Sequence, residues 1–157
     1  MADVRFLILC GPPSLDPSTV GYPPSEPDGG ADGWWYAWRL MASNNRRLAR
    51  GVTSFASRRF AVDAITRLRG ALTNLEPLVL ADPRDGSWGW HAELDGVRVV
   101  LCPHSYERER DCRGGFRRFL DAVPRAQVAE GGIILRDHRS PVPAAAQSRE
   151  SGRWPSH

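Results

Sequence analysis

The sequence contains no lysine, only three cysteines, and no hydrophobic run long enough to cross a membrane. All 21 basic residues are arginines, a pattern that GC-rich coding produces whatever the protein binds. A membrane-spanning helix needs about 20 consecutive apolar residues, so we expect no membrane partner. The cysteines, Cys10, Cys102 and Cys112, are odd in number and lack the spacing of a disulfide framework, which favours a reducing cytoplasm.

The composition is that of one soluble domain. The 157 residues are 41% hydrophobic and 25% charged, which is enough for one modest core and excludes a second large domain. The net charge of +3 is small, so its distribution along the chain is more informative than its sum.

Both ends of the chain differ from its middle. Residues 1–10 predict a buried N-terminal strand, because the apolar run from Val4 to Cys10 has no basic region before it and is too short for a signal peptide. Residues 11–33 are rich in proline and glycine and predict an extended or disordered loop. Residues 126–139 include Ile133 to Leu135, which predict a short closing strand, and residues 140–157 predict a disordered tail.

An internal repeat is the strongest pattern in the sequence. Residues 36–42 align with residues 88–94 at an offset of 52, and in both segments large apolar side chains alternate with small or polar ones. This period of two predicts strands with one buried face. We therefore expect two sets of side chains to share one core: Tyr36, Trp38, Leu40 and Ala42 from the first segment, and Trp88, Trp90, Ala92 and Leu94 from the second.

Each of these strands is followed by a turn, a second strand and a helix. The first helix is predicted to begin after Ser57 as its N-cap and to end before Gly70. The second carries Cys112, Phe116 and Phe119, and Pro124 stops it. Its small residues Gly114 and Gly115 weaken the helix but allow it to lie close to the sheet.

These observations predict an α+β fold of two tandem β-hairpin-helix repeats, packed as a pseudo-symmetric single domain. The repeats span residues 34–72 and 88–125, and residues 73–87 are interpreted as a linker. A unit of about 35 residues is too small to be stable alone, so each repeat needs the other.

The same pattern resembles the YegP-like family of small bacterial domains, which are commonly tandem copies of unknown function. The resemblance covers roughly residues 34–125 and rests on an aromatic strand, a Ser-aromatic pair and a helix in each copy. The matching residues are Trp38-Arg39-Leu40, Ala49, Ser54-Phe55 and Ala61 to Leu68 in the first copy, and Trp90, Ser105-Tyr106 and Cys112 to Leu120 in the second. No catalytic residue follows from this resemblance.

Charge is concentrated in the first repeat. Residues 34–70 contain eight arginines and the single acid Asp63, whereas residues 88–120 are nearly balanced and residues 1–33 are acidic. Coding bias does not explain missing carboxylates. A solvated or internally paired face, a nucleic-acid or phosphate surface and an acidic protein partner all fit this pattern. The candidate anion-binding residues, near the start of the first helix, are Arg46, Arg47, Arg50, Arg58 and Arg59.

Other candidate sites are weaker. Cys102, His104 and Cys112 match no standard zinc spacing and are interpreted as structural, so we expect neither a metal nor a cofactor. His104, Ser105 and Asp111 lack the glycine pattern of a nucleophile elbow, so we expect no catalytic residues. Trp34 and Trp35 lie at the start of the first repeat and are candidates for aromatic contact with a ligand.

We therefore expect a non-catalytic binding or protein-interaction module of the bacterial cytoplasm, with an unidentified protein partner. The alternative hypothesis is weak, sequence-nonspecific nucleic-acid or phosphate binding through the arginine-rich first repeat. The sequence does not determine the oligomeric state.

Overall fold

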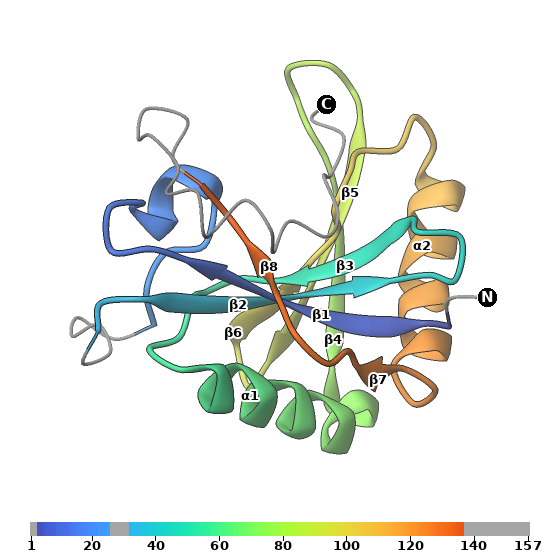
Figure 1. Cartoon of the computed structure of the whole chain (residues 1–157). Coiled ribbons are helices and arrows are strands. Elements are labelled where there is room, and N and C mark those ends of the chain that lie inside the picture. The colour runs from blue at the N-terminus through green and yellow to red at the C-terminus, as the bar shows by residue number, and fades with distance from the viewer. Residues whose placement is uncertain (1–2, 26–31, 137–157) are drawn as a thin grey trace.

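The computed structural model describes residues 3–25 and 32–136, which form one curved sheet with two helices on one of its faces (Figure 1). The strands are β1 (Arg5–Gly11), β2 (Trp35–Met41), β3 (Arg47–Gly51), β4 (Glu76–Ala81), β5 (Trp88–Leu94), β6 (Val97–Leu101), β7 (Gln127–Val128) and β8 (Ile133–Ile134). The helices are α1 (Arg58–Gly70) and α2 (Glu109–Ala122), with short 3₁₀ turns η1 (Pro17–Val20) and η2 (Leu72–Asn74).

The sheet order is β4-β5-β6-β3-β2-β1-β7, and β8 also pairs with β1. Two successive units, β1-β2-β3-α1 and β4-β5-β6-α2, are joined edge to edge by antiparallel pairing of β3 with β6. The α+β class is confirmed, but each unit has one more strand than the predicted hairpin. The interpretation of residues 73–87 as a linker is wrong, because residues 76–81 form β4. Its Pro77 lies on an edge strand, where a missing N–H donor is tolerated.

Both helices bury their apolar stripes in one core against the sheet. The Ser57 hydroxyl accepts a hydrogen bond from the Phe60 N–H at 3.2 Å, so the predicted N-cap of α1 is confirmed. The core includes Trp38 from the first unit and Trp90 from the second. At Gly115 in α2, an added Cβ would lie 2.2 Å from the Tyr106 hydroxyl, so this glycine is required for the close packing of α2.

The two units place corresponding residues in corresponding backbone pairs. The backbone of Tyr36 exchanges both hydrogen bonds with Phe55, and Trp88 does the same with Tyr106. Each hairpin also contains an irregularity, between Leu40 and Met41 in β2 and after Ala92 in β5. One predicted position differs, because Ala42 is only half-buried, whereas the neighbouring Met41 is fully buried.

A second, smaller core lies on the opposite face of the first unit. Leu15 and Tyr22 from the proline-rich segment pack there on Leu9, Trp35 and Ala37. Residues 12–25 thus follow a defined path that includes η1, which differs from the predicted extended or disordered loop. The reason is that apolar side chains among the prolines cover a sheet face that would otherwise be exposed to water.

The segment after α2 returns to the edge of the first unit. Strands β7 and β8 pair in parallel with β1, so the predicted closing strand is confirmed. The Arg58 guanidinium donates to the carbonyls of Gly131 at 2.7 Å and Ala129 at 3.0 Å, and Arg69 donates to the carbonyl of Ala126. The predicted tail, residues 140–157, lies outside the described residues. In residues 3–25 and 32–136, no helix has the length and apolar character of a membrane span.

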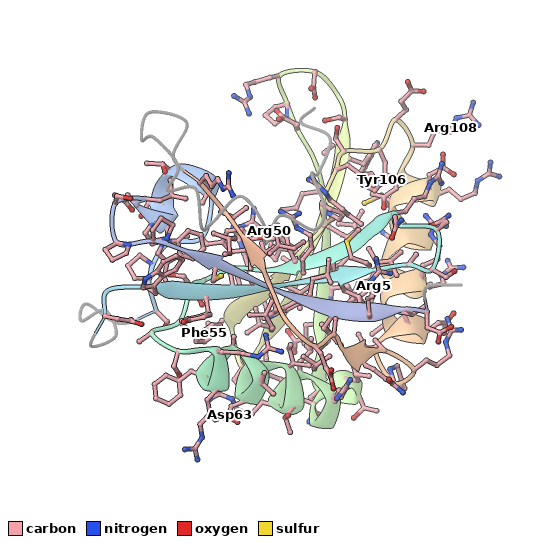
Figure 2. The ribbon with its side chains drawn as sticks, in the orientation of Figure 1. Arg5, Arg50, Phe55, Asp63, Tyr106 and Arg108 are labelled. Carbon is pink, nitrogen blue, oxygen red and sulfur yellow. The ribbon has the colours of Figure 1, made fainter. Side chains whose placement is uncertain are left out.

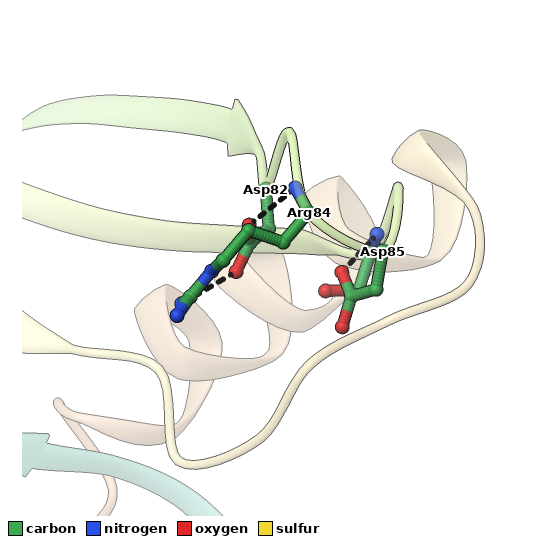
Figure 3. Close-up of polar contacts among 4 residues, drawn as sticks. Asp82, Arg84 and Asp85 are labelled. Carbon is green, nitrogen blue, oxygen red and sulfur yellow. Dashed lines mark hydrogen bonds and ion pairs between the residues drawn. The ribbon is translucent and has the colours of Figure 1, made fainter.

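The loop between β4 and β5 is fixed by its own side chains (Figure 3). The Asp82 carboxylate accepts from the Arg84 N–H at 2.9 Å and from its guanidinium at 3.1 Å, and Asp85 accepts from the Ser87 N–H at 2.9 Å. The hydrogen bonds from Ser87 lower the pKa of the Asp85 carboxyl. These carboxylates are used within the turn, which accounts for their clustering.

Candidate anion-binding site on the open sheet face

The sheet face opposite the helices, called the open face below, carries one row of residues across six strands. Strand register aligns Leu7 with Arg39, Arg39 with Arg50, and Arg50 with Leu101. The row continues from Leu101 to His91 and from His91 to Leu78. Because paired residues in a sheet point to the same face, these side chains are neighbours although they span most of the sequence.

Arg50 is held in this row by the proline-rich segment. Its guanidinium carbon lies 3.8 Å from the centre of the Tyr22 ring, a cation–π contact. Nε donates to the carbonyl of Gly51 at 3.2 Å, and Nη2 donates to the carbonyl of Gly21. Figure 2 shows Arg50 over β2 and β3, on the side of the sheet away from α1.

Arg39 and Arg47 bring two further positive charges next to Arg50. Arg39 is its partner on β2, and Arg47 pairs with Met41, two residues along the same strand. Burial lowers the pKa of Arg47 and of Arg50, and the Arg39 guanidinium lowers the pKa of both further, while the Tyr22 phenol acts in the opposite direction. Arginine stays charged at neutral pH even with a lowered pKa, so three cations share one half-buried patch.

Tyr22 completes this patch with a polar group. The residue is 1% exposed, and its hydroxyl has no hydrogen-bond partner within the described ranges 3–25 and 32–136. A buried hydroxyl without a partner costs about 1 to 3 kcal/mol. Tyr22, Arg39, Arg47 and Arg50 are called the arginine site below. It offers guanidinium and hydroxyl donors at one place, which is the donor set that binds carboxylates and phosphates.

The five arginines predicted from the sequence do not form one surface. Arg47 and Arg50 belong to the arginine site, whereas Arg46 is exposed beside the turn that leads into β3. Arg58 donates to two backbone carbonyls of the C-terminal segment, and Arg59 is exposed at the start of α1. The prediction grouped them by sequence proximity, but alternation along β3 and the turn before α1 direct them to different places.

Sequence reasoning did not include Arg39 or Tyr22 in the site. Arg39 is aligned with Arg50 by the pairing of β2 with β3, and the inward-facing Trp38 and Leu40 on either side already indicated that it faces the other way. Tyr22 is brought in by the fold of the proline-rich segment, for which no local pattern in the sequence gives a position.

Trp34 and Trp35 do not act as a pair of exposed aromatics. Trp35 is 6% exposed, and its indole N–H donates to the carbonyl of Leu15 at 2.8 Å. Its ring also stacks with that of Tyr22, with 6.3 Å between centroids. Trp35 therefore positions the proline-rich segment and is not open to a ligand, which corrects its predicted role. Trp34 is half-buried just before β2.

The cysteines lie in settings that favour the neutral thiol. The Cys102 sulfur accepts from the Trp90 N–H and donates to the carbonyl of His104, both at 3.3 Å, and burial raises its pKa. Burial, with a smaller contribution from Cys102, raises the pKa of Cys112 to about 11. Across residues 3–25 and 32–136, no group of three or more histidine, cysteine, aspartate or glutamate side chains is arranged to hold a metal ion.

Comparison with known proteins shows one similar fold. No family model matches the chain, and no curated protein matches it. The chain is similar to the solution NMR structure of YegP from E. coli, a protein of unknown function, with a TM-score of 0.52 over 82% of this chain and 92% of that one. The chain has a YegP-like fold. At 11% identity the YegP-like similarity establishes the fold alone, so the function must be argued from the site.

Proposed function

We propose that this protein is a non-catalytic binding module that holds an oxyanion, a carboxylate or a phosphate, at the arginine site. The observation that carries the proposal is the convergence of three guanidinium groups and the buried Tyr22 hydroxyl on one patch of the open face. Guanidinium groups match the geometry of both anions, and partial burial strengthens the attraction because less water screens it.

Electrostatic repulsion within the patch supports the same proposal. Arg39 disfavours the charges of Arg47 and Arg50, and no carboxylate is hydrogen-bonded to Arg50 within the described residues. An anion placed among them reduces this repulsion and offers an acceptor to the Tyr22 hydroxyl. Binding is therefore expected to stabilise the folded protein.

We also infer that the two units are pseudo-symmetric repeats. After the first turn, residues of the two repeats align at an offset of 51, so Leu101 is the residue of the second repeat that corresponds to Arg50. These two residues pair with each other across β3 and β6, as a two-fold axis between the strands requires. The matched backbone pairs of Tyr36 with Phe55 and of Trp88 with Tyr106 also support the repeats. The free thiols fit our proposal of a cytoplasmic protein.

The test of oxyanion binding compares two variants of neighbouring arginines, Arg47→Gln inside the arginine site and Arg46→Gln outside it. Thermal unfolding is measured in phosphate, in citrate and in chloride of equal ionic strength. Phosphate or citrate is expected to raise the Tm of the wild type and of Arg46→Gln, because Arg46 lies outside the site. Arg47→Gln is expected to lose most of this increase. An equal increase in both variants, or none in the wild type beyond that in chloride, would contradict the proposal.

A further inference from the structure

Among residues 3–25 and 32–136, a segment outside the sheet covers the open face of the first unit but not that of the second. In the first unit, Leu15 and Tyr22 of the proline-rich segment cover Leu9, Trp35 and Ala37. In the second unit, Leu78 and Leu101 lie in the open-face row. Neither of them is part of the main core or of the second core of the described structure. They are half-buried, and Leu80 on the same face of β4 is 54% exposed.

The proline-rich segment shows how a chain segment outside the sheet covers this type of surface, although it does so through turns and the 3₁₀ turn η1. Its apolar side chains pack on the sheet, and its backbone carbonyls accept hydrogen bonds from sheet side chains. The Leu15 carbonyl accepts from the Trp35 indole, and the Gly21 carbonyl accepts from the Arg50 guanidinium. An extended segment loses little entropy on docking when prolines already restrict it. The second unit presents an apolar strip of Leu78 and Leu101, which ends beside the arginines of the first unit.

The arginine site directly adjoins this strip. Arg50 and Leu101 are paired residues on adjacent strands. With strands about 4.8 Å apart, Leu101 lies about 5 Å from Arg50 along the row and Leu78 about 14 Å from it. His91 lies between the two leucines, 3.4 Å from the Glu93 carboxylate. An extended peptide advances about 6.6 Å every two residues, so it matches these intervals with every second side chain.

We propose that the open face of the second unit docks an extended acidic segment of a partner protein. Its carboxylate occupies the arginine site, and apolar side chains two and four residues away lie over Leu101 and Leu78. This inference rests on the proposed function, because the carboxylate uses the same arginines. Charge complementarity selects the partner, since the strip ends at three guanidinium groups.

The test measures binding by the fluorescence anisotropy of a dye-labelled peptide. The peptide carries an aspartate, with leucines two and four residues after it. Control peptides replace the aspartate by asparagine or both leucines by serine, and a single-stranded oligonucleotide tests nucleic acid. The intact protein is expected to prefer the first peptide. The asparagine peptide should bind about tenfold more weakly, because it loses one charged contact, and the serine peptide about a hundredfold more weakly, because it loses two buried apolar contacts.

Protein variants locate the binding. Leu78→Ser and Leu101→Ser are expected to weaken peptide binding about tenfold and to leave phosphate binding unchanged. Val97→Ser is the matched control, because Val97 is 63% exposed but lies outside the row. Amide chemical shifts of the wild type provide a measurement that does not depend on variant folding. Addition of the peptide is expected to move the signals of β3, β4, β5 and β6.

The outcomes separate the two proposals. Phosphate binding together with equal affinity for the leucine and serine peptides would overturn the docking inference and leave the proposed function standing. Absence of binding to phosphate, citrate and every peptide would overturn both. Tighter binding of the oligonucleotide than of the peptide, unaffected by Leu78→Ser, would also overturn the inference in favour of nucleic acid.

Discussion

Gly11→Ala is expected to detach the proline-rich segment from the sheet. A Cβ at Gly11 would lie 2.1 Å from Cε2 and 2.2 Å from Cζ2 of Trp35, far inside contact distance. Because Trp35 is only 6% exposed, its ring cannot turn aside without leaving the second core. The displacement also breaks the hydrogen bond from its indole N–H to the Leu15 carbonyl.

The cost of this substitution follows from two contributions. Overpacking of a core costs about 1 to 3 kcal/mol, and a lost buried hydrogen bond adds about 1 kcal/mol. For a chain of this size we expect the Tm to fall by about 10 °C. Phosphate binding should weaken as well, because the same segment carries Tyr22.

Gly89→Ala is the matched control in thermal unfolding and phosphate titration. Gly89 also lies within a strand, but its added Cβ would meet only the Cys102 sulfur, at an ordinary 3.6 Å. It should change the free energy of unfolding by less than about 0.5 kcal/mol. Equal stability of the two variants would refute the requirement for a glycine at Gly11.

Three further predictions concern the main core. Gly115→Ala should lower the free energy of unfolding, because its Cβ would lie 2.2 Å from the Tyr106 hydroxyl, whereas Gly114→Ala should raise it by about 1 kcal/mol through helix propensity. Trp38→Ala and Trp90→Ala should each lower the free energy of unfolding by about 3 to 5 kcal/mol in one cooperative transition, and separate transitions for the two units would contradict the shared core. The raised pKa of Cys112, about 11 against an ordinary 9.0, stabilises the neutral thiol in the fold. The contribution of Cys112 to stability in urea should therefore be constant below pH 9 and fall between pH 9 and 11, and the stability of Cys112→Ala should fall less steeply over that range.

Local patterns in the sequence were sufficient to predict most elements of the main core. Alternation in residues 88–94 identified the buried face of β5, and Ser57 identified the start of α1. Strand β4 was missed because its alternation is weak at an exposed edge, where Glu76 and Pro77 need not fit a core. The register shift between Leu40 and Met41 depends on the pairing of β2 with β3, which no single strand encodes.

The candidate site was only partly predictable, because it is defined by register. Charge counting found the arginine excess of the first repeat and thus Arg47 and Arg50, but proximity in sequence also added Arg58, which holds the C-terminal segment. Arg39 joins the site through the pairing of β2 with β3, and Tyr22 joins it through long-range packing. Both depend on contacts between segments that are distant in sequence.

Tyr22→Phe tests the oxyanion site most directly, because it removes one hydroxyl and leaves the ring under Arg50. Without a bound anion the variant should be at least as stable as the wild type, by up to about 1 kcal/mol, since the buried hydroxyl has no partner among the described residues. Its affinity for phosphate, measured by calorimetry, should fall about tenfold. A variant that is less stable than the wild type and binds phosphate equally well would contradict the account.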